Sequence, residues 1–197
     1  YGILRCDPSP DKRELLPDGT GRSSKKECVL PLILREALAR LNPDIPGEKL
    51  EEIARDLCRD FSATDMTATN YKYYNQIRNG IKISLRRNGK EDFDFVKLVD
   101  FDRPENNPFP AVSQMWIQGR VYWRRPDVLI FINGLPMVFV ELKNSIVKVE
   151  EAYNDNLKNY LRDIPNLFAL NQICVLSNGL ETRLGAFNAT YNNFFEW

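Results

Sequence analysis

Apolar residues in the first part of the chain recur at helical spacing. Residues 1–22 are rich in proline, glycine and charge, and we expect them to form an irregular lead-in. The leucines that follow stand at positions i, i+4, i+8 and i+11, which predicts an amphipathic helix. These leucines are Leu30, Leu34, Leu38 and Leu41. A capping box from Ser24 to Glu27 would open this helix, although Pro31 could restart it.

Two further helices are predicted before the pattern changes. Residues 42–47 contain two prolines and a glycine, which end the first helix. Four apolar residues at helical spacing then predict a second helix: Leu50, Ile53, Leu57 and Phe61. A shorter third helix is expected over residues 70–78.

Beyond residue 80, apolar and polar positions alternate or form short apolar runs, which predicts β-strands. The predicted strands are 81–86, 93–101, 112–117, 128–132, 137–142, 172–177 and 181–184. Asn88-Gly89 and Asn133-Gly134 are hairpin-turn sequences, and residues 102–110 have the composition of a loop. A helix over 153–164, ended by Pro165, separates the last two strands from the others.

The composition is that of an ordinary globular domain and excludes several classes of protein. Of the 197 residues, 43% are hydrophobic and 27% charged, and 27 Lys and Arg balance 27 Asp and Glu, so DNA binding through bulk positive charge is disfavoured. Histidine is absent, which excludes Ser-His and Cys-His nucleophiles and His-ligated zinc. The four cysteines are scattered, which favours free thiols in a reducing cytoplasm. No apolar run is long enough to predict a membrane span.

Three charged residues stand at the ends of two otherwise apolar strands. Asp127 precedes the first strand, whereas Glu141 and Lys143 lie two residues apart near the end of the second and face the same side. A hard cation such as Mg²⁺ prefers oxygen ligands, and the two carboxylates with the Leu142 backbone carbonyl could hold one. Lys143 could then orient a bound water and stabilise developing negative charge. The structural alternative is a Lys-Glu pair on the sheet rim, with Asp127 capping a strand.

The register of the hairpin decides between these two interpretations. If Asn133-Gly134 formed a plain two-residue turn, Asp127 would pair with Val140 and Glu141 would face the opposite side of the sheet. An odd-length connection or a β-bulge would bring both carboxylates to one face. A magnesium site therefore requires such an irregularity.

The order Asp127, Glu141, Lys143 on adjacent strands resembles that of the PD-(D/E)xK nucleases, and the surrounding sequence is more specific. Five stretches together resemble the N-terminal endonuclease domain of the R subunit of type I restriction enzymes. They are Arg-Glu-Ala-Leu-Ala-Arg-Leu-Asn-Pro-Asp-Ile-Pro (35–46), Asp-Phe-Asp-Arg-Pro-Glu-Asn-Asn (100–107), Arg-Arg-Pro-Asp (124–127), Asn-Gly-Leu-Pro-Met-Val-Phe-Val-Glu-Leu-Lys-Asn (133–144) and Asn-Gln-Ile-Cys-Val-Leu-Ser-Asn-Gly (171–179). The resemblance implies that Asp127 and Glu141 bind Mg²⁺ and that Lys143 is catalytic.

The same resemblance implies further site residues and a fold. The family commonly has a Gln-x-x-x-Tyr pair on the following helix; here Tyr160 matches and Asn156 stands in place of the glutamine. Tyr160 is expected at the catalytic site, with a core aromatic as the alternative, and Asn156 is expected to reach DNA. Glu36 matches a carboxylate that some nucleases of this fold use, although a solvated helix face is the simpler interpretation. The implied fold is α/β, a restriction-endonuclease-like mixed central sheet flanked by helices.

Other clusters of charged or aromatic residues are weaker candidates. Arg120, Arg124 and Arg125 are close in sequence to Asp127 and are expected to contact DNA phosphates. The Asp-Phe-Asp repeats at 92–94 and 100–102 are expected to be outward polar positions rather than a second metal site. The tyrosines at 71–74 are expected to pack rather than to stack on bases.

The sequence thus predicts a magnesium-dependent endonuclease domain over residues 23–197, as part of a longer cytoplasmic polypeptide from a bacterium or archaeon. Resemblance implies double-stranded DNA as substrate and the modification and specificity subunits of a restriction complex as partners. A Walker-type loop is missing from the sequence, so ATP would act only through a translocase region outside this chain. The alternatives are a self-sufficient PD-(D/E)xK nuclease for repair or junctions, and a non-catalytic module that docks on DNA or a partner.

Overall fold

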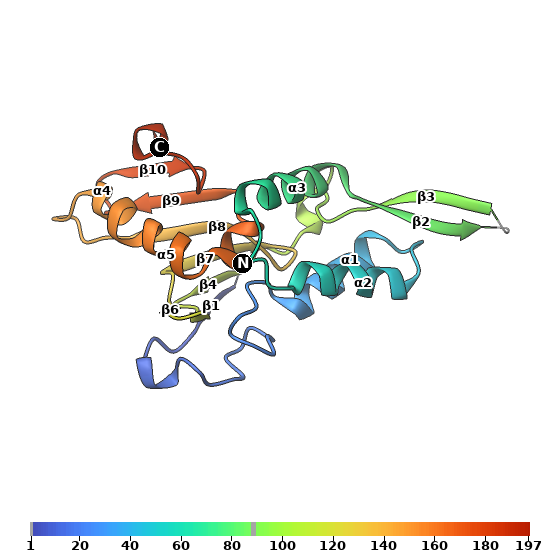
Figure 1. The fold of residues 1–197 in the computed structure, drawn as a ribbon, viewed down its shortest axis with the longest axis horizontal. Coiled ribbons are helices and arrows are strands. Elements are labelled where there is room, and N and C mark those ends of the chain that lie inside the picture. Colours follow the sequence, from blue (N-terminus) through green and yellow to red (C-terminus); the bar gives the residue numbers. More distant parts are fainter. Residues whose placement is uncertain (1, 88–89) are drawn as a thin grey trace.

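A computed structural model describes residues 2–87 and 90–197, and the strands found in them build one mixed sheet with two separate ribbons (Figure 1). Seven of the described strands form the main sheet in the order β1-β4-β7-β8-β9-β10-β11. Their bounds are Ile3–Arg5 (β1), Ala111–Ser113 (β4), Val128–Ile132 (β7), Leu135–Leu142 (β8), Ile173–Ser177 (β9), Thr182–Gly185 (β10) and Phe195–Glu196 (β11). The β1-β4 and β8-β9 pairs are parallel and the rest antiparallel.

Two ribbons and the helices lie outside this sheet. The ribbons pair β2 (Ile81–Arg87) with β3 (Lys90–Val96) and β5 (Ile117–Gln118) with β6 (Trp123–Arg124). The α-helices are α1 (Pro31–Leu41), α2 (Gly47–Cys58), α3 (Met66–Asn79), α4 (Val149–Glu151) and α5 (Lys158–Asp163), with a π-helix (Ala152–Leu157) between the last two. Short 3-10 helices cover Pro10–Lys12, Pro104–Asn106, Pro165–Ala169 and Tyr191–Asn193. The mixed α/β architecture with flanking helices confirms the predicted fold class.

Two clusters of buried residues hold these layers together. In the first, Leu157 and Tyr160 from the segment after β8 pack on Leu129 and Phe139 of the sheet. In the second, α1, α2 and α3 pack together with β2 and β3 and reach the sheet at Leu135. Figure 1 shows β2 and β3 projecting beyond the helices on the side away from α4. None of the described helices has the length and apolar character needed to cross a membrane.

Several sequence predictions need correction. Residues 1–22 are not wholly irregular, because Ile3–Arg5 pairs with β4 at the edge of the sheet. The predicted capping box does not open α1: Ser24 and Glu27 close a local turn, and the helix begins at Pro31, whose fixed φ suits a first helical residue. The strand expected over 93–101 ends at Val96. The hairpin turn predicted at Asn88-Gly89 lies outside the described residues.

The β7-β8 hairpin contains the β-bulge that a shared carboxylate site requires. Asn133 and Gly134 have φ values of 52° and 83°, as a two-residue turn of the mirror-image type needs. Phe131 pairs with Pro136, but Ile130 pairs with Val138, so one extra residue, Met137, lies in β8. A proline in a central strand is tolerated at such a bulge because no ladder N–H is lost there. The prediction of an irregular register is therefore confirmed, with a bulge rather than a three-residue loop as its cause.

The bulge changes which residues face each other at the far end of the hairpin. Val128 pairs with Val140 beyond it, and the next positions in that register are Asp127 and Glu141. The Met137 carbonyl accepts hydrogen bonds from the Gln172 N–H (2.8 Å) and from the Asn171 side-chain amide (3.2 Å). The two residues that precede β9 therefore stabilise the irregular register.

The hairpin turn is seated on the start of helix α1. The Leu30 N–H donates to the Gly134 carbonyl at 2.9 Å. A Cβ on Gly134 would lie 2.6 Å from the Leu30 carbonyl oxygen and 2.8 Å from the Leu34 nitrogen. Glycine is thus required here both by its positive φ and by the closeness of the helix.

We expect Gly134→Ala to lower the free energy of unfolding by about 3 kcal/mol, because left-handed strain and overpacking add. Gly179→Ala is the matched control: Gly179 has the same φ of 83° but no atom within 4 Å of a built Cβ. It should cost only about 1 kcal/mol. Urea denaturation of both variants measures the difference, and equal losses would contradict the proposed seating of the turn.

Candidate active site

Asp127 is held in place from two neighbouring strands. Its Oδ2 accepts a hydrogen bond from the Leu142 backbone N–H at 2.8 Å. Its Oδ1 accepts one from the Gln114 side-chain amide at 3.1 Å, and its carbonyl accepts one from the Gln114 N–H at 3.0 Å. The carboxylate is therefore fixed at the point where β4, β7 and β8 meet.

Glu141 is a buried carboxyl group beside Asp127. It is 3% exposed, its Oε1 accepts a hydrogen bond from the Asn156 side-chain amide at 2.5 Å, and the Lys143 ammonium lies 4.0 Å from the same oxygen. Its Oε2 is buried and has no hydrogen-bond partner among the described residues. Burial and the nearby Asp127 carboxylate raise the pKa of Glu141 to about 8, although Lys143 opposes this. Near neutral pH the Glu141 carboxyl is therefore mostly protonated, and a cation bound between the two carboxyls would favour its ionised form.

The helical segment after β8 closes the site from one side. Asn156 lies in the π-helix and Tyr160 one turn later in α5. Tyr160 packs edge-to-face on Phe139 with centroids 5.4 Å apart, and its hydroxyl donates to the Arg125 carbonyl at 3.2 Å. Burial and the Glu141 carboxyl raise the pKa of Tyr160. Tyr160 is therefore a core aromatic that also borders the carboxylates, and its expected role at the catalytic site stays a prediction.

An open groove of about 550 Å³ leads to Asp127 and Lys143. Its other lining residues come from β1, the segment after it, β4 and the strand ends: Ile3, Arg5, Pro8, Ser113, Gln114, Val128 and Leu142. Arg5 is exposed at the sheet edge, in the row of residues that continues through Ser113 and Val128. The groove therefore offers two cations, Arg5 and Lys143, beside one carboxylate.

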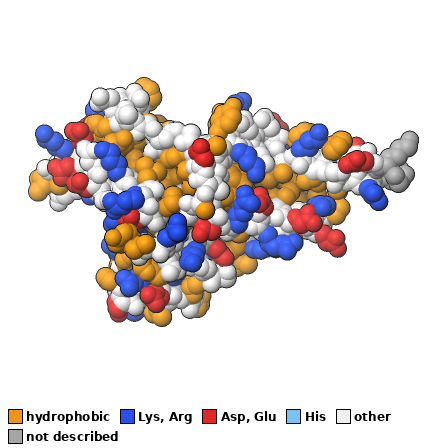
Figure 2. Space-filling model, in the orientation of Figure 1, with side chains coloured by type: hydrophobic (Ala, Val, Ile, Leu, Met, Phe, Trp, Pro, Cys, Tyr) orange, Lys and Arg blue, Asp and Glu red, His pale blue; other side chains and the backbone are white. Residues whose placement is uncertain are grey.

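The predicted arginines lie in three different environments. Arg124 forms an ion pair with Asp163 at 2.5 Å. Arg125 stacks on the Trp116 ring at 5.2 Å and donates to the Pro8 carbonyl, so it borders the site without contacting its carboxylates. Arg120 is exposed on the segment between β5 and β6. Figure 2 shows positive and negative side chains interspersed on the visible face, in keeping with a net charge of +0.

The remaining candidates are placed away from the carboxylates. Glu36 is exposed on α1. Tyr73 is fully buried and packs edge-to-face on Phe61, as a packing role predicts, whereas Tyr71 is 67% exposed. The four cysteines are free, as expected.

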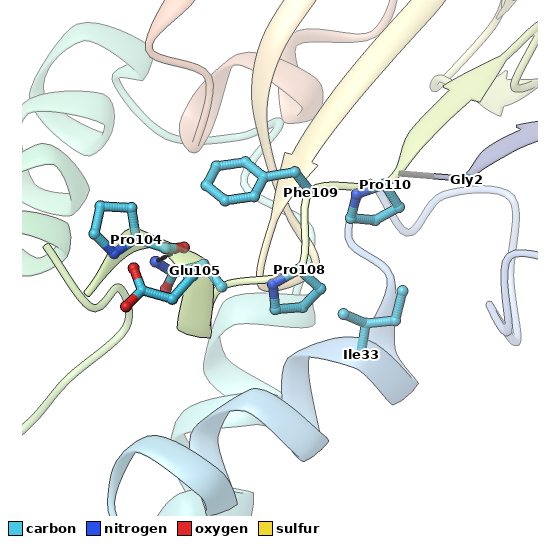
Figure 3. A pocket seen from close by; sticks show the side chains of 8 residues that line it. Gly2, Ile33, Pro104, Glu105, Pro108, Phe109 and Pro110 are labelled. Atoms are coloured by element: carbon cyan, nitrogen blue, oxygen red, sulfur yellow. Dashed lines mark hydrogen bonds between the residues drawn. The ribbon is translucent and has the colours of Figure 1, made fainter.

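A cavity of about 640 Å³ lies between α1 and the 104–110 loop (Figure 3). Its lining is dominated by proline and apolar side chains: Gly2, Ile33, Pro104, Glu105, Asn107, Pro108, Phe109 and Pro110. Glu105 is the only ionisable group in that lining, so the cavity lacks the paired carboxylates and cation found at the end of β8.

The donors at the strand ends suit a hard cation. Within residues 2–87 and 90–197, no three Asp, Glu, Cys or His side chains come together, so a metal would rest on Asp127, Glu141 and backbone oxygen. The feature that fits this arrangement best is the buried Glu141 Oε2, which makes no hydrogen bond within the described residues, although the Tyr160 hydroxyl is close enough to Glu141 to lower its pKa. Magnesium is bound in this way, through one or two carboxylates with water and substrate as the other ligands.

Sequence reasoning missed Gln114 and Arg5. Gln114 has no motif around it, and its contact with Asp127 depends on the β4-β7 pairing. Arg5 belongs to the stretch that we expected to be irregular, and only the parallel pairing of β1 with β4 brings it to the groove.

The raised pKa of Glu141 predicts a pH-dependent stability difference. A carboxyl with a pKa near 4.5 when unfolded and about 8 when folded costs stability as pH rises between these values. Glu141→Gln stays neutral, so its advantage over wild type should be absent below pH 4.5 and grow to roughly 5 kcal/mol at most above pH 8. Urea denaturation in EDTA at acidic and alkaline pH measures this. A pH-independent difference would show that Glu141 does not titrate as described.

Comparison with known proteins places this chain in a family. Residues 6–193 match the family described as type I restriction enzyme R protein N terminus. The type I restriction enzyme HindI endonuclease subunit of Haemophilus influenzae is 34% identical over 83% of this chain. The putative type I restriction enzyme MjaIXP endonuclease subunit of Methanocaldococcus jannaschii is 32% identical over 93%. The chain covers 16% and 18% of the length of these relatives. The protein therefore belongs to the family of type I restriction enzyme R protein N termini.

Proposed function

We propose that this chain is the magnesium-dependent endonuclease domain of a type I restriction enzyme R subunit and hydrolyses phosphodiester bonds of double-stranded DNA. The observation that carries the proposal is the bulged β7-β8 register, which sets Asp127 beside Glu141 with Lys143 at the same strand end. A rim ion pair would not need a buried second carboxylate whose Oε2 has no described partner. The names of the relatives, which call them endonuclease subunits, point the same way.

Asp127, Glu141 and the Leu142 carbonyl are the groups that would hold Mg²⁺. When bound, the ion would lower the pKa of a coordinated water and stabilise negative charge on the phosphate. Asp127 is ready for this role because each carboxylate oxygen keeps lone pairs beyond its single hydrogen bond. Glu141 would have to be ionised, which the positive charge of the cation favours.

Lys143 orients the attacking water and complements the charge that develops on the phosphate. Its side chain is 24% exposed, so the ammonium can reach both the groove and the Glu141 carboxylate. Asn156 holds Glu141 Oε1 by donating from its amide. Tyr160 supports the site from behind through Phe139 and the Arg125 carbonyl.

The groove beside the carboxylates receives a DNA strand. Arg5 on its wall and Lys143 at its end would contact phosphates, which attract cations regardless of base sequence. Arg125 extends this cationic border, and Arg124 does so only if its ion pair with Asp163 opens. Arg120 lines a separate hollow beside Asp163, so it would contact DNA phosphates outside this groove.

The domain works within a larger assembly in the bacterial or archaeal cytoplasm. Modification and specificity subunits would supply site recognition, which a chain of net charge +0 does not provide by bulk charge. ATP would be used by a translocase region elsewhere in the R subunit. Cleavage by the R subunit alone, without ATP, would instead favour a self-sufficient nuclease, and binding without cleavage would favour a docking module.

We expect Lys143→Ala and Asp127→Asn to lower Mg²⁺-dependent DNA cleavage by the full assembly at least about 100-fold. Lys148→Ala is the matched control, because Lys148 is an exposed lysine on the same connection to α4. It should cleave like wild type. Plasmid linearisation with ATP and all subunits measures the rates, and ATP hydrolysis shows that the assembly is intact. Near wild-type cleavage by either site variant, with normal ATP hydrolysis, would overturn the proposed site.

A further inference from the structure

We propose that Gln114 is a positioning residue that orients the Asp127 carboxylate for the cation, an inference that rests on the proposed function. Gln114 follows directly on β4, and its side chain lines the groove beside Asp127 and Lys143. Its amide donates to Asp127 Oδ1 at 3.1 Å. It would act through Asp127, not by contact with the DNA phosphate.

Gln114 has a strained backbone conformation, and packing of its side chain gives no reason for a glutamine at this position. Its φ is 60°, in the left-handed region that costs an ordinary side chain energy and that glycine or asparagine adopts more readily. The next residue, Met115, is fully buried, and the Gln114 N–H donates to the Asp127 carbonyl at 3.0 Å. The chain is therefore anchored on both sides of the strained position. Glycine would satisfy this backbone, so the glutamine side chain is what needs a reason.

We infer that the glutamine side chain is needed to restrict rotation of the Asp127 carboxylate. The terminal torsion of an aspartate is broad, so one hydrogen bond leaves the plane of its oxygens loosely defined. Here each oxygen has its own donor from a different part of the sheet: Gln114, directly after β4, for Oδ1 and the Leu142 N–H of β8 for Oδ2. The two donors fix the plane before any ligand arrives. Groups that orient a metal ligand in this way commonly change metal affinity or activity by about 10- to 100-fold.

Two variants separate positioning from a purely structural role. Gln114→Gly and Gln114→Ala both remove the amide, but only glycine relieves the positive φ. We expect both to weaken Ca²⁺ binding about tenfold and to raise the Mg²⁺ concentration for half-maximal DNA cleavage about tenfold. Gln114→Ala should also unfold at lower urea than Gln114→Gly, which should match or exceed wild type. A loss of affinity that follows stability, large for alanine and absent for glycine, would overturn the inference.

The binding measurement uses calorimetric titration of the full-length R subunit with Ca²⁺, without nucleotide. Asp127→Asn serves as the reference for a lost ligand. If Asp127→Asn abolishes binding while Gln114→Gly binds like wild type, this inference fails and the proposed function stands. If wild type binds no Ca²⁺ and Asp127→Asn cleaves DNA normally, both fail.

Discussion

The position of one extra residue in β8 determines whether this protein has a site at all. Without Met137 as a bulge, Glu141 would lie on the face opposite Asp127, and no side-chain motion could restore the pair. The turn at Asn133-Gly134 and its contact with the start of α1 fix one end of the hairpin. Asn171 and Gln172 donate hydrogen bonds to the Met137 carbonyl at the bulge. Contacts far from the carboxylates thus set their alignment.

The arrangement of the two carboxyl groups in this site lowers the stability of the folded protein. Glu141 is buried beside a second carboxylate, and this raises its pKa even though Lys143 and the Tyr160 hydroxyl favour the ionised form. Such arrangements are found where a group must bind a cation or move a proton, because a purely structural carboxyl would be paired or exposed. The bulk of the fold, two packed clusters around the sheet, compensates for this local cost.

The sequence predicted the site residues that stand out as charges at the ends of apolar strands. It did not predict the residues whose position depends on which strands pair. Asp127, Glu141 and Lys143 could be found because charges interrupt apolar strands, and the need for an irregular register followed from counting residues. The position of the bulge was not predicted, although a proline inside a central strand, such as Pro136, is found mainly at bulges. Gln114 and Arg5 could not be found, because β1 and β4 are strands of three residues whose partners lie far away in sequence. The π-helix that carries Asn156 likewise has no pattern of its own.

The most direct test of the shared carboxylate site is anomalous diffraction from crystals soaked in Mn²⁺, which substitutes for Mg²⁺ and can be located by its own scattering. We expect one strong peak within direct coordination distance of a carboxylate oxygen of Asp127 and of Glu141 Oε2. The same peak should vanish in Asp127→Asn crystals. A peak elsewhere, or none at these two carboxylates at millimolar Mn²⁺, would contradict it.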